Sequence, residues 1–235
     1  MTTATPTPHL LDVLGGLQDD FLTTIGQVDP STRVPWCGRW RVRDLVVHLA
    51  RIHHWAAGQA RRAPETPLGR GPFVLEDLYA TCAAELRDTL AELGPDAPAW
   101  TLTGTGTAVF WHRRQTHETL VHLWDLRTAG GLGLAVEPTL WADTVDEVVT
   151  VMQPRQERMG RMEPLPAPVE LVAQDAGHTW LLGAPTVPQP TVTVTGPAQA
   201  LALLLWGRTT PADERLTVTG DRAALEDALS RRLTP

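Results

Sequence analysis

The segment WHRRQTHETLVHLWD, residues 111–125, contains neither proline nor glycine and precedes Gly130-Gly131, so we predict a helix over about 111–128. Glu118 and His122 lie four residues apart within it. Side chains at this spacing share one face of a helix, where a carboxylate and an imidazole can bind one divalent cation. The segment therefore predicts a helix that presents ionisable side chains toward neighbouring helices.

Amphipathic helices are predicted on both sides of this segment. Apolar residues recur at three- and four-residue steps, which indicates helices with one buried face. The predicted helices cover about 10–28, 42–62 and 74–93, and another begins after Pro138, with its continuation past Pro154 left open. Long helices joined by loops, without alternating apolar and polar residues, predict an antiparallel bundle.

The composition changes at the proline-rich segment MEPLPAP, residues 162–168. Beyond it, helices are predicted at about 197–206 and 221–232. Short β-rich runs surround them, at 169–173, 179–182, 191–195 and 216–219. We therefore expect a helical bundle over 1–161, followed by a small α+β unit over 162–235.

The charge of the chain argues against two classes of partner. The chain has 20 basic and 27 acidic residues and a net charge of -7 at pH 7, which argues against nucleic acid and against an anionic membrane surface. The longest apolar run, residues 200–206, is far shorter than the roughly 20 residues that cross a bilayer, and the N-terminus lacks the features of a signal peptide. We expect a cytoplasmic protein with small neutral or anionic ligands.

The cysteine and lysine content restricts the chemistry further. Two cysteines, Cys37 and Cys82, are too few for a disulfide framework, and neither belongs to a C-x-x-C pair. Every basic residue is arginine, so Schiff-base chemistry by lysine is excluded. We interpret Cys37 as a small buried residue at a loop-helix junction, and the alternatives are a fourth metal ligand or a redox-sensitive thiol.

His48 is the best candidate for a third metal ligand, because it interrupts the apolar stripe of the helix predicted at about 42–62. A buried imidazole needs a partner, and the alternative to a metal is a hydrogen bond to a neighbouring side chain. Two histidines and one carboxylate suit zinc and leave a coordination position open, as in catalytic sites. Asp125, one turn beyond His122, is then an outer partner of the site.

The other histidines do not add to this site. His117 and Glu118 resemble the start of the zinc-protease motif H-E-x-x-H, but His122 follows one residue too late. Five residues turn a helix by about 140°, so His117 and His122 cannot both reach one ion, and the peptidase class is excluded. Three more histidines are interpreted as surface histidines, because nothing in their spacing indicates the alternative, that they line the pocket as proton carriers: His53, His54 and His112.

Four segments carry recognisable motifs: WCGRWRVRDLVVHLA at 36–50, RQTHETLVHLWD at 114–125, LLLWGR at 203–208 and VTGD at 218–221. Together they resemble the mycothiol-dependent maleylpyruvate isomerase family over essentially the whole chain. The resemblance implies a DinB-like antiparallel four-helix bundle followed by a small α+β, sterol-carrier-like C-terminal domain. It also implies two cofactors, zinc and mycothiol, with nickel and iron left open as alternatives to zinc.

By this resemblance, His48, Glu118 and His122 match three zinc ligands, and Arg208 matches an arginine of the C-terminal domain that faces the active site. A zinc ion with an open position holds a thiol as the thiolate, which is a nucleophile. The thiolate either adds to an activated double bond and leaves after bond rotation, or stays attached to the substrate. The planar guanidinium of Arg208 suits a carboxylate of substrate or cofactor.

We therefore predict an enzyme, either a mycothiol-dependent transferase or a cis-trans isomerase. The alternative is a non-catalytic metal-binding or small-ligand-binding protein, with a sensing role, on the same scaffold. The expected partners are a low-molecular-weight thiol and a small electrophile, and the expected assembly is a monomer or weak homodimer.

Overall fold

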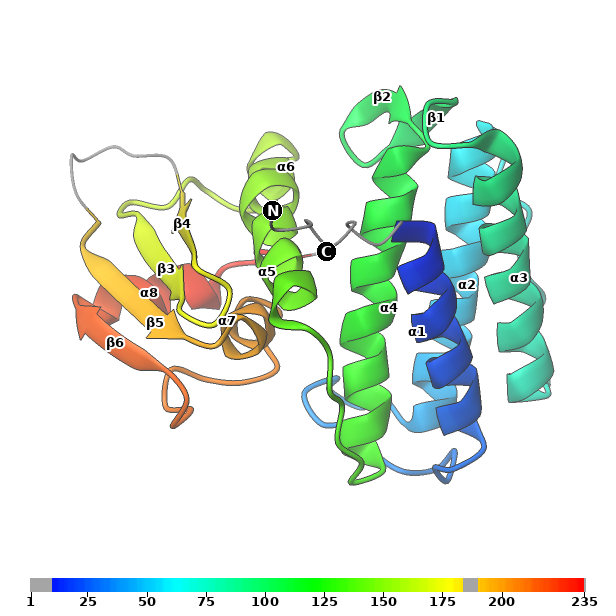
Figure 1. Ribbon diagram of the computed structural model, residues 1–235, viewed down its shortest axis with the longest axis horizontal. Coiled ribbons are helices and arrows are strands. Elements are labelled where there is room, and N and C mark those ends of the chain that lie inside the picture. Colours follow the sequence, from blue (N-terminus) through cyan, green and yellow to red (C-terminus); the bar gives the residue numbers. More distant parts are fainter. Residues whose placement is uncertain (1–9, 184–189, 235) are drawn as a thin grey trace, which may run out of the picture. The chain divides into compact units, whose positions relative to one another are not determined.

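The computed structural model of the chain describes residues 10–183 and 190–234 (Figure 1). Its internal contacts divide the chain into two compact units, Met1–Leu134 and Ala135–Pro235. The first unit is mainly helical, and the second contains a four-stranded sheet with helices. This confirms the predicted class, a helical part followed by a small α+β part.

Four helices form the body of the first unit. They are α1 (Leu10–Ile25), α2 (Val42–Arg61), α3 (Leu75–Leu93) and α4 (Val109–Ala129). α1 and α2 each pack against both α3 and α4, and Figure 1 shows the four helices side by side. The sequence therefore predicted these four helices correctly, with ends that agree within three residues.

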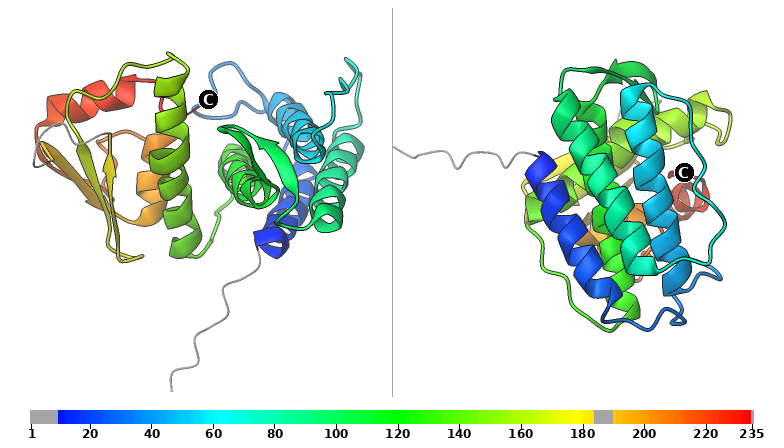
Figure 2. Two further views of the ribbon diagram at one scale, coloured as in Figure 1. Left: turned by 90° about the horizontal axis from the view of Figure 1, so that it is seen from above. Right: turned by 90° about the vertical axis from the view of Figure 1, so that its right-hand side faces the viewer.

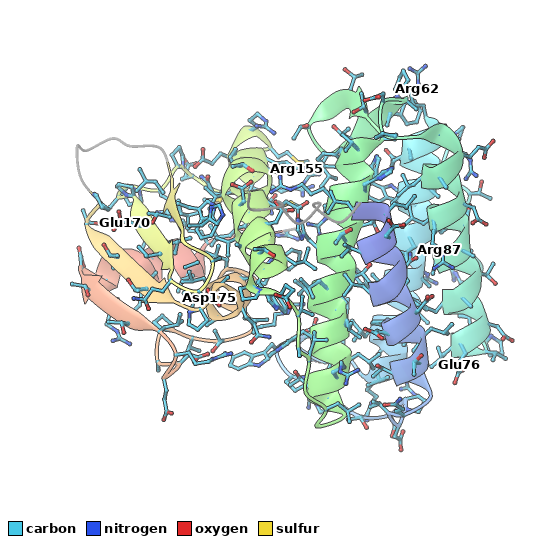
Figure 3. All side chains as sticks on the ribbon, in the orientation of Figure 1. Arg62, Glu76, Arg87, Arg155, Glu170 and Asp175 are labelled. Carbon is cyan, nitrogen blue, oxygen red and sulfur yellow. The ribbon has the colours of Figure 1, made fainter. Side chains whose placement is uncertain are left out.

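The connection between α2 and α3 returns the chain along the length of the bundle. α2 ends beside Arg62 at one end of the bundle, and Glu76, in the first turn of α3, lies at the opposite end (Figure 3). The segment 62–74 is long enough for this return, because an extended chain covers roughly 3.3 Å per residue and a helix only about 1.5 Å. α2 and α3 therefore run in the same direction, and the predicted antiparallel packing applies to the pairs α1–α3 and α2–α4.

The bundle core is built from the apolar stripes of all four helices. Its largest fully buried side chains are Trp111, Tyr79, Phe21, Leu14, Leu45, Leu49, Leu86, Leu90, Leu120, Leu123 and Leu126. A short hairpin of β1 (Pro98–Thr101) and β2 (Gly104–Thr107), which the sequence analysis did not predict, precedes α4 and packs against α2. None of the described helices combines the length and the apolar character that a membrane crossing requires.

The second unit contains a mixed sheet in the order β4-β3-β5-β6. Its strands are β3 (Val169–Ala173), β4 (His178–Leu182), β5 (Val192–Gly196) and β6 (Thr217–Gly220). β3 and β5 are parallel and bury alternate residues, and the helices α7 (Ala198–Leu205) and α8 (Arg222–Ser230) pack against them. Figure 2 shows these helices on one side of the sheet.

The helix after Pro138 belongs to the second unit. It runs through α5 (Pro138–Glu147), a wider π turn (Val148–Met152) and α6 (Gln153–Arg158), and α5 packs against α7. The π turn lies directly before Pro154, whose ring and missing N–H are incompatible with a regular helix interior. The helix therefore continues past Pro154, and the division after Leu134 differs from the boundary expected after residue 161.

His54 links the segment 62–74 to the bundle by two hydrogen bonds. Its Nδ1 lies 2.6 Å from Glu85 Oε2 on α3, and its Nε2 lies 2.5 Å from the carbonyl oxygen of Thr66. Both partners are acceptors, so the ring makes both hydrogen bonds only when both nitrogens carry a proton. Burial lowers the pKa of His54, but these two hydrogen bonds and the charges of Glu85 and Glu65 outweigh it and raise the pKa above its ordinary value of 6.5.

We expect the attachment of this segment to weaken as the pH rises. Because the pKa of His54 is higher in the folded than in the unfolded chain, its stabilising contribution is complete below about 6.5 and is lost as the pH rises through the folded value. The contribution should be up to about 1 kcal/mol, as for other partly exposed pairs. NMR titration should give a raised pKa for His54 that falls in Glu85→Gln and not in Glu92→Gln. An unshifted His54 in the wild-type protein would contradict this prediction.

Candidate metal centre

Three side chains from two helices converge inside the first unit. His48 lies on α2, and Glu118 and His122 lie on one face of α4. One possible ligand atom from each residue lies within 4.8 Å of the other two. Glu118 Oε1 is 3.6 Å from His48 Nε2 and 3.2 Å from His122 Nε2. The structure thus brings together all three residues that the sequence analysis singled out as metal ligands.

The spacing of these atoms fits a single divalent cation. Nitrogen and oxygen ligands lie about 2.1 Å from zinc, so two ligands of a tetrahedral site are roughly 3.4 Å apart. Both distances from Glu118 are close to this value. His122 is buried, whereas the side chain of His48 is 31% exposed and leaves the cluster open to solvent on that side. A site of this kind admits a further ligand from outside the protein.

Asp125 orients one of the imidazoles. Its Oδ2 lies 2.9 Å from His122 Nδ1, one turn further along α4, and the carboxylate is fully buried. Nδ1 therefore donates its proton to Asp125, and Nε2 faces Glu118, so an ion bound there would meet the Nε2 lone pair, as in histidines that bind metals. Cys37 Sγ lies 3.6 Å from the same carboxylate oxygen, so Cys37 is a half-buried neighbour of the site.

Arg114 balances the charge of Glu118. Its guanidinium forms a buried ion pair with Glu118 Oε2, one turn earlier on α4, and leaves Oε1 facing the two histidines. Burial raises the pKa of Glu118, but Arg114 and the hydrogen bonds from His122 and His48 outweigh it and hold the pKa well below 4.5. Glu118 is therefore a carboxylate at neutral pH. Arg114 was not predicted as part of the site, although its i,i+4 spacing from Glu118 indicated the pair.

His53 and His112 are buried, so the prediction that they are surface histidines was wrong. His53 Nδ1 lies 2.9 Å from Gln115 Oε1, and its Nε2 is buried without a hydrogen-bond partner among the described residues. Burial lowers the pKa of His53 to about 4, so the ring is neutral at physiological pH. His53 lies in the core of the bundle because it follows His48 on α2 by five residues, which turns it toward α3 and α4.

Arg208 lies in the second unit, directly after α7. Its Nη1 donates a hydrogen bond of 2.7 Å to the carbonyl oxygen of Trp206, and its guanidinium carbon lies 5.8 Å from the centre of the Trp206 ring. These contacts orient the guanidinium. That Arg208 binds a carboxylate of substrate or cofactor stays a prediction.

Two family models match the chain. The model described as mycothiol maleylpyruvate isomerase N-terminal domain matches residues 17–127, and the one described as MDMPI C-terminal domain matches residues 139–227. Crystal structures of a mycothiol-dependent maleylpyruvate isomerase and of its histidine-to-alanine mutant are similar to this chain, with TM-scores of 0.65 and 0.66. Each shares 16% identity and covers 94% of this chain and 97% of that chain, so the likeness concerns the fold. No curated protein matches the chain.

Proposed function

Because the chain belongs to the mycothiol maleylpyruvate isomerase family, we propose that it is a mycothiol-dependent enzyme with its metal centre at His48, Glu118 and His122. The observation that carries this proposal is the convergence of three ligand atoms within 4.8 Å of one another, from two helices. We propose zinc as the metal, since two imidazoles and one carboxylate with an open side suit it. When bound at such a site, zinc stabilises a thiol as its nucleophilic thiolate at neutral pH.

The residues around the centre have distinct roles in this proposal. Asp125 fixes the tautomer and orientation of His122. Arg114 compensates the negative charge of Glu118 and keeps one carboxylate oxygen turned toward the histidines. The exposed side of His48 is the route by which thiol and substrate approach. Arg208 of the second unit is proposed to bind a carboxylate of the substrate or of the thiol.

The substrate is a small electrophile with an activated double bond or an equivalent acceptor carbon. Elimination of the thiol after bond rotation gives cis-trans isomerisation, and retention of the thiol gives S-transfer. Both outcomes use the same nucleophile, so the family alone does not select between them. A cytoplasmic location and a monomer or weak homodimer remain predictions from the sequence.

Thiol consumption and product geometry test the proposed activity. The zinc-loaded protein is incubated with mycothiol and a panel of electrophiles that includes maleylpyruvate, and free thiol and the cis and trans products are followed in time. We expect acceleration with at least one electrophile, loss of activity after chelation and recovery on adding zinc. Isomerisation leaves the amount of free thiol constant, whereas transfer consumes one thiol for each product.

One observation favours a second candidate function, a non-catalytic metal-binding or sensing protein. Glu118 and His122 already have charged partners in Arg114 and Asp125, so these four residues form a network of ion pairs without a bound ion. A site that is satisfied in this way can bind and release an ion as a signal. Tight zinc binding without acceleration of any electrophile in the panel would support this function over the enzymatic one.

A further inference from the structure

An open groove in the first unit runs beside the candidate metal centre. It has a volume of about 730 Å³ and is lined by α2, by the turn before it and by the segment that leads into α3. Sites for ligands of ordinary cofactor or drug size have about 300–1,000 Å³. His48 lines this groove, so whatever occupies it lies next to the proposed metal ligand.

Arginine is the commonest residue type in the lining of the groove. Four arginines line it, at positions 39, 43, 51 and 70, and Asp44 is the only carboxylate among the lining residues. The chain as a whole carries a net charge of -7, so this excess of positive charge is local. Guanidinium groups pair with carboxylates and phosphates in a planar, bidentate geometry.

Most of this positive charge has no internal partner. In the part of the chain that the structure describes, neither Arg39 nor Arg70 has a carboxylate within ion-pair distance, and Arg43 reaches Asp44 only at 3.9 Å. Asp44 Oδ2 accepts a hydrogen bond of 2.8 Å from the backbone N–H of Arg41, so this carboxylate caps α2. Arg51 donates to the carbonyl oxygen of Gly69 and leaves its charge uncompensated.

Two nearby arginines serve as a contrast, because their side chains hold the protein together. Arg33 donates to the carbonyl oxygen of Gly38, and Arg41 donates to that of Ser31. These bonds fix the turn before α2. The first backbone N–H groups of α2 are also used, since Val42 and Arg43 donate to carbonyl oxygens of the preceding turn. An anion in the groove is therefore bound by the arginine side chains and not by the helix terminus.

We propose that this groove, called here the arginine groove, binds an organic anion with two or more carboxylate or phosphate groups and holds it beside His48. A ligand with several negative charges matches the excess of guanidinium groups, whereas a single carboxylate would leave most of them uncompensated. If the anion is the electrophile, the arginine groove sets the substrate class of the enzyme, and this step rests on the proposed function. Anion binding itself does not depend on the metal.

The experiment measures anion binding to metal-free protein, prepared with a chelator that is then removed. Calorimetric titrations use pyrophosphate as the phosphate probe, tricarballylate as the carboxylate probe and acetate as the singly charged control. The variant Arg43→Gln/Arg70→Gln removes two charges from the arginine groove. Arg222→Gln is the matched control, because Arg222 lies on α8 and its side chain is 57% exposed, close to the 59% of Arg43.

We expect saturable binding of at least one multiply charged probe, and which probe binds more tightly identifies the anionic group. Affinity should fall at least about tenfold in the double variant, equivalent to about 1.4 kcal/mol, and should be unchanged in Arg222→Gln. It should also weaken at high salt, since the charges are exposed. No binding of either probe to the metal-free wild type, or equal binding to the double variant, would overturn the proposal. Loss of turnover with retained anion binding would count against the proposed function alone.

Discussion

Glu118→Gln should lose most of its metal, whereas the wild-type protein purified without added metal should contain about one zinc per chain. The substitution keeps the shape of the side chain but removes the charged ligand oxygen between His48 Nε2 and His122 Nε2. We expect metal affinity to fall by more than the roughly 10–100-fold that is typical of lost outer partners. Elemental analysis and competition with a chromogenic chelator measure both quantities.

Two further variants distinguish the loss of a metal ligand from a loss of folding stability. Glu118 also neutralises the buried Arg114, so its removal leaves an unpaired charge that lowers stability. His48→Ala removes a ligand that is partly exposed and leaves Glu118 paired with Arg114, so it should lose the metal with less effect on folding. Glu76→Gln, at an exposed carboxylate at the start of α3, is the control and should keep its zinc. Stoichiometric zinc in both ligand variants would contradict the metal assignment.

Asp125→Asn should have a smaller effect on metal affinity, because Asp125 contacts His122 and not the ion. The amide accepts a hydrogen bond from His122 Nδ1 only in one of its two orientations, and it carries no charge to support the imidazole. Metal affinity should fall by about 10–100-fold, less than in Glu118→Gln.

Trp111→Ala should destabilise the bundle by about 3–5 kcal/mol, the cost expected when the largest buried side chain leaves a cavity. The indole of Trp111 is fully buried and makes edge contacts with the rings of Trp55 and Phe110, at 5.2 and 5.1 Å between ring centres. Its Nε1 donates a hydrogen bond of 2.7 Å to the carbonyl oxygen of Trp100. Trp111→Ala removes the two ring contacts and the hydrogen bond together.

Urea unfolding of metal-free protein measures this effect without the contribution of a bound ion. Trp100→Ala is the matched control, because its side chain is 41% exposed and its carbonyl group, the partner of Trp111, is retained. The control should lose clearly less stability than Trp111→Ala, because a large part of Trp100 is exposed in the folded protein. Equal destabilisation by the two substitutions would mean that the Trp111 cluster is not a core of the bundle.

The residues of the candidate metal centre could be singled out because spacing within one helix is a local property. Glu118 and His122 share a face of α4 at i,i+4 spacing, and His48 interrupts an apolar stripe on α2. Family membership, which the motifs indicated, is confirmed by the matching family models. The helices α1, α2 and α3 were also predictable from local spacing, since their apolar faces repeat every three to four residues.

Features that depend on distant contacts were not predictable in this way. The burial of His53 follows from its packing between Gln115 and Tyr79, which belong to other helices. The helix after Pro138 looked like a fifth member of the bundle, but its apolar face packs against α7. The hairpin at 98–107 is short, and three of its eight strand residues are glycine or proline, which weakens any strand signal.

The return of the chain between α2 and α3 has a consequence for how an ion would stabilise the protein. The ligands on α2 and α4 are 70 residues apart in sequence, and all of α3 lies within the intervening stretch. An ion bridging these ligands acts as a cross-link, which restricts the entropy of the unfolded chain more when the enclosed loop is long. α3 supplies no ligand, yet its backbone amides should exchange with solvent more slowly whenever the cross-link is in place.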